Sequence, residues 1–161
     1  MTAGANAGRD VGRIEVSKED YLGVAKRLKE KGFQRLLTVS AVDWIEEGTY
    51  EVYFVVHSLD ENRYVEVTTY IRRDDPRIAS LSGIWLNAPM HEREVWELFG
   101  IDFDGNAMLR PLFLEDWIGP PPFRKDCNWR EYVKKNFTLS APQEGDEHGP
   151  NRPDQSPESR S

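Results

Sequence analysis

The sequence predicts an α+β fold, in which helices and an antiparallel or mixed sheet form a two-layer domain followed by an extended C-terminal docking arm. Residues 50–71 show the pattern of a strand hairpin, and residues 18–31 and 90–99 repeat apolar side chains at helical spacing. The expected organisation is a flexible N-terminal arm of residues 1–11, an α+β domain of residues 12–100, an arm of residues 101–140 and an acidic tail of residues 141–161.

Composition and charge limit the classes of function. A chain of 161 residues is long enough for one domain with a hydrophobic core. Its net charge of −7 argues against general nucleic-acid binding, which needs a basic face. The chain has no apolar run of the length that spans a bilayer, and its polar start does not resemble a secretory signal. Because Cys127 is the single cysteine, we expect a soluble protein of a reducing, cytosolic compartment.

The first helix is expected over residues 18–31. The segment Ser17-Lys18-Glu19-Asp20 resembles a capping box, in which a side-chain hydroxyl accepts a hydrogen bond from an early backbone N–H. Apolar residues then recur at helical spacing as far as Leu28. Gly32 stands where a left-handed residue commonly ends a helix.

Strand signals occupy the next part of the chain. Residues 33–44 carry alternating apolar side chains, and residues 50–58 are rich in β-branched and aromatic residues. A polar turn at residues 60–62 leads to residues 63–71, where apolar and polar side chains alternate. We therefore expect an antiparallel hairpin with one buried face.

Two helix-start signals follow the hairpin. Asp75-Pro76 places an N-cap residue before a proline at the first helical position, which predicts a short helix to about Leu81. Asn87-Ala88-Pro89 repeats this signal before a second helix over residues 90–99, which Gly100 is expected to end.

The C-terminal tail, residues 141–161, has the composition of a disordered segment. It contains one apolar residue, four prolines, five acidic residues and two arginines. Such a segment buries too little apolar surface to offset the loss of chain entropy on folding.

Each catalytic template that we tested lacks a required residue. His91-Glu92 begins like the HExxH motif of zinc proteases, but Val95 replaces the second histidine. His91 and Glu94 share a helix face and would bind a metal only with ligands from elsewhere, which leaves a small free metal-dependent enzyme as an unfavoured alternative. The following glycines lack the lysine and hydroxyl of a P-loop. We expect no catalytic, cofactor-binding or metal-binding residue in this chain.

The helix over residues 90–99 carries three carboxylates, on Glu92, Glu94 and Glu97. Arg93 precedes Glu97 by four residues and is well placed to pair with it along the helix. Spacing alone favours a solvated, dipole-compatible helix start over acid–base groups or partner-binding charges. Trp96 broadens the apolar face, so the helix must be covered on more than a narrow stripe.

The segment from residue 101 to residue 126 has too many large apolar side chains to remain in water. Pro120-Pro121-Pro122 is stiff and extended, and Arg124-Lys125-Asp126 ends the segment with two cations. The segment must pack on its own domain or on a partner, and composition leaves both possibilities open. A third functional alternative is a free adaptor whose acidic tail binds a basic partner.

One ordered set of residues resembles the signature of a known family. The set comprises Glu92-Arg93-Glu94, Glu97-Leu98-Phe99-Gly100, Phe103-x-Gly105, Arg110, Trp117-x-Gly119 and Arg124-Lys125-Asp126. It is similar to the 30-kDa subunit of respiratory complex I, the C-type subunit of the bacterial enzyme, over roughly residues 12–135. Related subunits occur in F420H2 dehydrogenases and in energy-converting hydrogenases. The chain departs from the family at Asn106, where histidine or lysine is usual.

The resemblance implies a non-catalytic, cofactor-free subunit of a proton-translocating NADH:quinone oxidoreductase of the respiratory electron-transport chain. Its expected partners are the 49-kDa-type (D-type) subunit and the iron–sulfur subunits of the B and I types. Iron–sulfur clusters, and flavin, are expected in those partners. The implied location is the cytoplasmic side of the cell membrane, in the peripheral part of a membrane complex. The residues expected to dock the partners are Glu92, Arg93, Glu94, Trp96, Glu97, Phe99, Arg110, Trp117, Arg124, Lys125 and Asp126.

Overall fold

The computed structural model describes residues 11–136, and the fold is given for these residues. They belong to two compact units that divide after Trp129. The first unit is an α+β domain together with the chain that follows it. The second begins at Arg130 and contains all but the first residue of helix α3 (Trp129–Asn136). The predicted acidic tail, residues 1–10 of the N-terminal arm and residues 137–140 lie outside the described residues.

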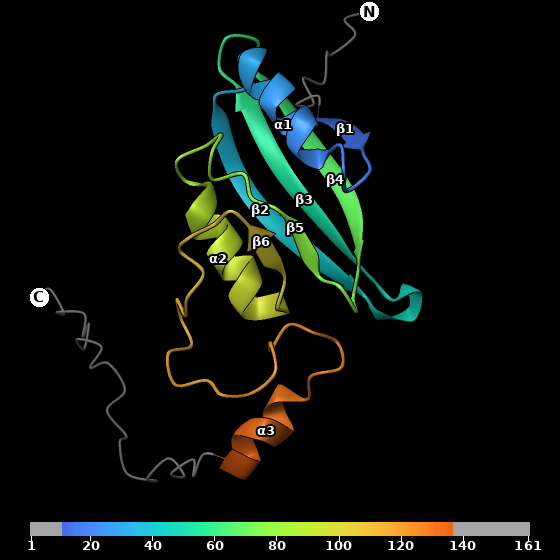
Figure 1. Ribbon diagram of the computed structural model, residues 1–161, viewed down its shortest axis with the longest axis vertical. Coiled ribbons are helices and arrows are strands. Elements are labelled where there is room, and N and C mark those ends of the chain that lie inside the picture. The colour runs from blue at the N-terminus through green and yellow to red at the C-terminus, as the bar shows by residue number, and fades with distance from the viewer. Residues whose placement is uncertain (1–10, 137–161) are drawn as a thin grey trace, which may run out of the picture. The chain divides into compact units, whose positions relative to one another are not determined.

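The main sheet has four strands in the order β1-β4-β3-β2 (Figure 1). Their bounds are β1 Val11–Glu15, β2 Arg35–Trp44, β3 Thr49–Ser58 and β4 Arg63–Arg72. Strands β2, β3 and β4 are antiparallel neighbours, which confirms the predicted hairpin. Strand β1 pairs in parallel with β4, so the sheet is mixed. This strand was not predicted, and Val11 belongs to it rather than to an N-terminal arm.

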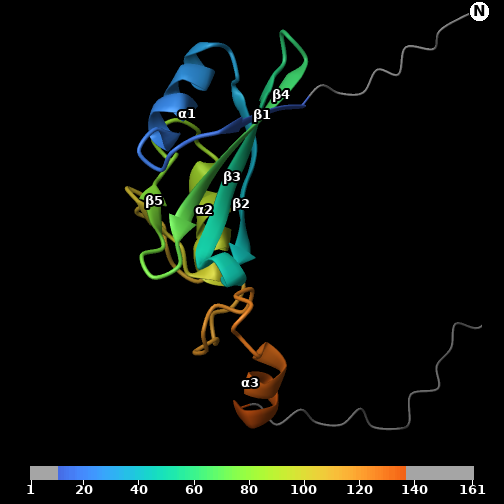
Figure 2. The ribbon, with the colours of Figure 1, turned by 90° about the vertical axis from the view of Figure 1, so that its right-hand side faces the viewer.

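Both longer helices lie on one face of this sheet (Figure 2). The ring of Tyr21 in α1 (Tyr21–Glu30) is 5.2 Å from that of Phe54, and the ring of Phe99 in α2 (Ala88–Phe99) is 6.4 Å from that of Tyr50. Tyr50 and Phe54 are fully buried residues of the same parity in β3. The structure is therefore the predicted two-layer α+β domain, with its core between helices and sheet.

Both helices end close to the predicted glycines, but α1 (Tyr21–Glu30) begins three residues later and α2 (Ala88–Phe99) two residues earlier than predicted. The Ser17 hydroxyl accepts from the backbone N–H of Asp20 at 3.2 Å, but the following residues form a turn and α1 begins only at Tyr21. Gly32, just beyond this helix, has a φ of +93°. Helix α2 ends at Gly100, which has a φ of +76° and donates its N–H to the Trp96 carbonyl at 2.9 Å.

The prediction of a short helix after Asp75-Pro76 is wrong. The chain there forms strand β5 (Arg77–Ala79), which pairs in parallel with β6 (Asp102–Asp104) as a second, two-stranded sheet. Ile78 and Phe103, which face each other in this pairing, are both buried. The helix-start signal is followed by too few residues to nucleate a helix. Burial of Ile78 against Phe103, which is distant in the sequence, therefore favours the strand. The first residues of the expected arm therefore belong to the domain.

The backbone conformation and the surroundings of Gly100 both require a glycine at this position. A Cβ atom at this position would lie 2.9 Å from Cγ of Pro121. The left-handed conformation itself costs a residue with a side chain about 1–2 kcal/mol. We expect Gly100→Ala to lower the free energy of unfolding by about 2 kcal/mol or more, as measured by urea denaturation.

Gly48 provides a matched control for this substitution. It has a φ of +66°, and a Cβ there would meet nothing within 4 Å. Gly48→Ala therefore carries the conformational cost alone. If both variants lose the same stability, Pro121 does not pack against the end of α2.

Candidate docking surface

Glu92 lies in the interior of the protein, with 0% of the residue exposed. Its carboxylate accepts hydrogen bonds from the Leu81 N–H at 2.5 Å, the Ser80 hydroxyl at 2.7 Å and the Asn106 amide at 2.9 Å. Burial raises the pKa of the Glu92 carboxyl above its ordinary value, although the three donors favour the charged form. The carboxylate ties α2 to the segments that directly follow β5 and β6.

The interpretation of Glu92 as part of a solvated helix start is wrong. Its side chain points toward the second sheet, where the polar groups that need an acceptor belong to this same chain. Glu92 therefore leaves the set of surface charges expected for docking. Sequence reasoning missed Ser80 and the role of Asn106, because a serine and an asparagine in loops carry no distinctive signal.

Asn106 is held in one orientation. Its side-chain oxygen accepts from the Met108 N–H at 2.8 Å, which leaves the amide nitrogen to donate to Glu92. The residue at which the sequence departs from the family's usual histidine or lysine is thus the direct partner of the buried carboxylate. A neutral amide supplies a hydrogen bond there without a compensating positive charge.

Arg93 and Glu97 do not pair along the helix as expected; each binds the backbone of the arm instead. The Arg93 guanidinium donates to the carbonyl of Arg110 at 2.7 Å and also to the carbonyl of Pro111. The Glu97 carboxylate accepts from the N–H groups of residues 112, 113 and 114 at 2.8–3.2 Å. Several hydrogen bonds to an ordered backbone are worth more than one exposed ion pair.

The aromatic residues of α2 also bind the arm. The Phe99 ring contacts that of Phe123 edge to face at 5.7 Å, and the Phe123 N–H donates to the Leu98 carbonyl at 2.9 Å. Trp96 and Trp117 line one cavity between the helix and the arm. The part of the arm that precedes residue 127 therefore packs on the domain of its own chain. Of the two possibilities left open by composition, the structure shows the first for this segment.

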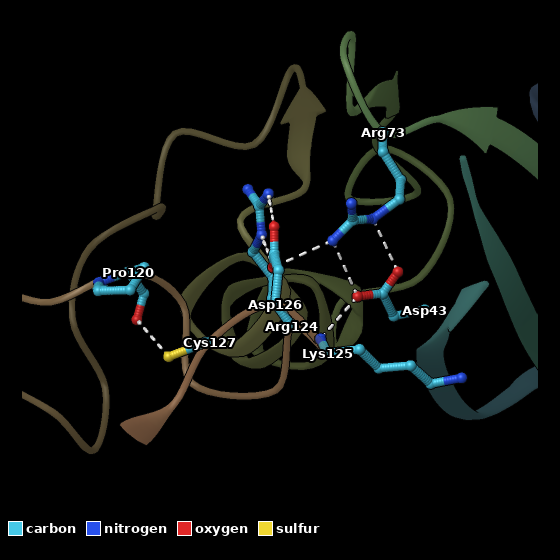
Figure 3. A network of polar contacts seen from close by, with 7 residues as sticks. All are labelled: Asp43, Arg73, Pro120, Arg124, Lys125, Asp126 and Cys127. Atoms are coloured by element: carbon cyan, nitrogen blue, oxygen red, sulfur yellow. Dashed lines mark hydrogen bonds and ion pairs between the residues drawn. The ribbon is translucent and has the colours of Figure 1, made fainter. Parts of the chain in front are cut away.

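A network of charged residues fixes the far end of this segment (Figure 3). We call its members, Asp43, Arg73, Arg124, Lys125 and Asp126, the latch. Asp43 is buried and accepts from Arg73 Nη2 at 3.1 Å and from the Lys125 backbone N–H at 2.8 Å. Arg73 Nε also lies 2.8 Å from Asp43 Oδ1, but off the hydrogen-bond direction, so this contact is electrostatic.

The acidic end of the latch is Asp126. It accepts two hydrogen bonds from Arg124, at 2.8 and 3.0 Å, and lies 3.1 Å from Arg73. The bonds from Arg124 lower the pKa of Asp126 to about 2, so the pair stays charged in moderately acidic solution. Arg124 and Asp126 are thus already engaged within this chain, and the Lys125 ammonium lies 5.5 Å from the centre of the Trp44 ring.

Sequence reasoning missed Asp43 and Arg73. One signal for Asp43 was available, because it has the strand parity of the buried residues Val39 and Ala41. An acidic residue at a buried strand position needs a partner. No comparable signal marked Arg73, which lies just beyond β4.

Several predicted docking residues and apolar neighbours do remain on the surface. Glu94 and Arg110 are exposed. Among the apolar residues of the arm, Phe113 is 66% exposed and Ile118 is 86% exposed. Within residues 11–136 there is no cluster of three or more side chains suited to a metal ion, and no helix that could span a membrane.

The family model of the respiratory-chain NADH dehydrogenase 30 Kd subunit matches residues 14–133. The chain belongs to this family. The resemblance seen in the ordered motif is therefore confirmed, and the matched range contains the latch and all of the domain except the first residues of β1.

Named relatives agree with this assignment. The C-type subunit of NADH-quinone oxidoreductase from Mycolicibacterium gilvum is 33% identical over 124 residues, which cover 73% of this chain and 54% of the relative. The C-type subunit of the F(420)H(2) dehydrogenase from Methanosarcina mazei is 34% identical over 116 residues, covering 71% and 73%. The C/D-type subunit of NADH-quinone oxidoreductase from Phocaeicola vulgatus is 36% identical over 116 residues, which cover 71% of this chain but only 22% of the relative.

Solved structures share the fold. A chain of the membrane-bound sulfane sulfur reductase, described as an archaeal respiratory membrane complex, superposes with a TM-score of 0.73 at 30% identity. The match covers 87% of this chain and 86% of that one. A trypsin-resistant fragment of Nqo5 superposes with a TM-score of 0.55 at 24% identity, covers 62% of this chain and 81% of the fragment, and supports the fold alone.

The Glu92 site predicts a specific effect of Glu92→Gln. An amide nitrogen in place of either carboxylate oxygen faces an N–H donor, from Leu81 on one side and from Asn106 on the other. We expect a loss of about 1–3 kcal/mol in the free energy of unfolding, the usual cost of an unsatisfied buried donor. Glu94→Gln, at an exposed position of the same helix, should change stability little.

The difference in unfolding free energy between the wild type and Glu92→Gln should depend on pH. Because the folded-state pKa of Glu92 is raised, its contribution to stability is fully present below the ordinary carboxyl pKa and is lost as pH rises through the folded value. The variant has no such titration. The stability gap between the wild type and Glu92→Gln should therefore narrow as pH rises from about 4. A gap that widens with pH would show that the site prefers the charged carboxylate.

The latch predicts the behaviour of Asp43→Asn. The substitution removes the buried charge that holds Arg73 and the Lys125 N–H. We expect amide hydrogen exchange of the arm near residue 125 to accelerate about tenfold or more, as for the loss of one hydrogen bond to a charged group. Asp74→Asn breaks an exposed ion pair with Arg72 and should leave this exchange unchanged.

Proposed function

We propose that this chain is a non-catalytic structural subunit in the peripheral arm of a membrane-associated, proton-translocating quinone oxidoreductase of the complex I type. The observation that carries the proposal is the match to the 30 Kd subunit family over residues 14–133. The ordered arm supports it, because two residues of the family signature, Arg93 and Glu97, hold the arm against α2. In this role the chain contributes an assembly surface, and partner subunits carry the iron–sulfur clusters and flavin.

We place the contact with partners on the outer side of the arm. Phe113 is largely exposed although its own N–H is bound by Glu97 of α2. Ile118 is also largely exposed, and it follows Trp117, whose indole donates to the Pro120 carbonyl. Large apolar side chains held out on an ordered segment are typical of protein interfaces. The proposed partners are the 49-kDa-type subunit and the iron–sulfur subunits of the B and I types, on the cytoplasmic side of the membrane.

A second assignment within the same class has its own support. The relative from Methanosarcina mazei is a subunit of an F(420)H(2) dehydrogenase, and this chain covers 73% of its length. The structural match at TM-score 0.73 is to a membrane-bound sulfane sulfur reductase. The alternative is the equivalent structural subunit of an F420H2 dehydrogenase or of a membrane-bound hydrogenase, and the relative from Methanosarcina mazei supports the first of these. The two assignments differ in the electron donor, which partner subunits determine.

Co-expression with the 49-kDa-type subunit of the same organism tests the proposal. We expect a stable complex on size-exclusion chromatography with this chain in stoichiometric amount. Phe113→Glu and Ile118→Glu should each weaken the complex at least tenfold, since a charge replaces a buried apolar contact. Leu86→Glu is the control, because Leu86 is 100% exposed and lies outside the arm. A chain that stays monomeric beside every subunit of the complex would contradict the proposal.

A further inference from the structure

One cavity in the domain unit has an unusual chemical lining. We call it the indole pocket, and it lies between the last turns of α2 and the arm. Its volume is about 230 Å³, room for one long side chain. Besides two glycines, it is lined by Trp96, Glu97, Pro111, Leu114, Trp117 and Pro121. The walls are therefore two indole rings and apolar aliphatic groups, with a single carboxylate among them.

The carboxylate of Glu97 is fixed in place by the arm. Oxygen Oε1 accepts from the N–H groups of residues 112, 113 and 114, at 2.8–3.2 Å. Oxygen Oε2 accepts only from the Phe113 N–H, at 3.0 Å, so it keeps capacity for a further donor. Within the described residues no cationic side chain lies within ion-pair distance of Glu97. Arg93, one turn earlier, is committed to the carbonyl groups of the arm.

The indole of Trp117 is fixed as well. Its Nε1–H donates to the Pro120 carbonyl at 2.9 Å, which orients the ring within the loop. The proline-stiffened segment and Gly100 hold the opposite wall, because Pro121 contacts the end of α2 there. The pocket is thus built by ordered groups rather than by a chance gap between loose loops.

We propose that the indole pocket receives an arginine side chain of the partner subunit; this inference rests on the proposed function. A guanidinium group satisfies the three features together. It donates to the free capacity of Glu97 Oε2, it stacks on indole faces through cation–π attraction, and its aliphatic stem covers proline and leucine surface. An aliphatic side chain would shield Glu97 Oε2 from water without using its remaining acceptor capacity, which is unfavourable. The net charge of −7 also favours a basic partner surface.

The test uses the full chain and three small probes, N-acetyl-arginine amide, its uncharged isostere N-acetyl-citrulline amide and N-acetyl-leucine amide. Two-dimensional NMR follows the indole N–H signals, with Trp96→Phe and Trp117→Phe to assign them. We expect the arginine probe to shift both signals with a dissociation constant of roughly 1 mM. The citrulline and leucine probes should bind at least tenfold more weakly.

Glu97→Gln should bring the arginine affinity down to that of the citrulline probe, whereas Glu94→Gln, at an exposed position of the same helix, should keep wild-type affinity. The proposal is overturned if the leucine or citrulline probe binds as tightly as the arginine probe, if none shifts the two signals at about 50 mM, far above the expected dissociation constant, or if Glu97→Gln has no effect. The probe series uses the unaltered chain, so it remains decisive if Glu97→Gln loosens the arm.

The outcome is separable from the co-expression result. A chain that assembles with the 49-kDa-type subunit and ignores the arginine probe rejects the pocket assignment alone. A chain that binds the arginine probe and no subunit keeps the pocket and rejects the proposed function.

Discussion

The buried carboxylate of Glu92 is the interaction on which the arrangement of the domain depends. It reaches from α2 to the chain that leaves β5 and to the chain that leaves β6, and it satisfies donors from both. These two strands form the small parallel sheet from which the chain continues into the arm. Without an acceptor at this point, the Leu81 N–H and the Asn106 amide would be buried without a hydrogen-bond partner. Each would then lower the free energy of unfolding by about 1–3 kcal/mol. The position of α2 is thereby set relative to the second sheet.

Once α2 is placed, its other polar residues determine the course of the arm. Arg93 binds arm carbonyl groups and Glu97 binds arm N–H groups. One helix thus supplies partners to the polar groups of an irregular backbone that is not paired in a helix or sheet. The latch then fixes the segment near Lys125 to the ends of β2 and β4. The arm is consequently a surface made by this chain itself. A partner would bind apolar groups and a pocket that are already ordered, so little conformational entropy would be lost on binding.

Strong local patterns in the sequence predicted the correct elements. The hairpin of β3 and β4, both long helices and the glycine that ends α2 were all predictable, because alternation, helical periodicity and left-handed caps are properties of short segments. Family membership was also predictable from an ordered set of residues. Strand β1 was missed, since five residues with mostly exposed side chains carry no periodic signal. The sequence predicted a helix in place of strand β5 for a related reason. Strand β5 is stabilised by pairing with β6, and the paired residues Arg77 and Asp102 lie 25 positions apart in the sequence.

The sequence alone therefore determined the fold class, the helices, the central hairpin and the family of this protein. Only the tertiary structure decided which charges face solvent. Glu92, Glu94 and Glu97 occupy adjacent turns of one helix, yet one is buried under a second sheet, one is exposed and one binds the arm. The physical reason is that the environment of a side chain depends on chain segments distant in sequence. Local spacing fixes only the direction in which each carboxylate leaves the helix.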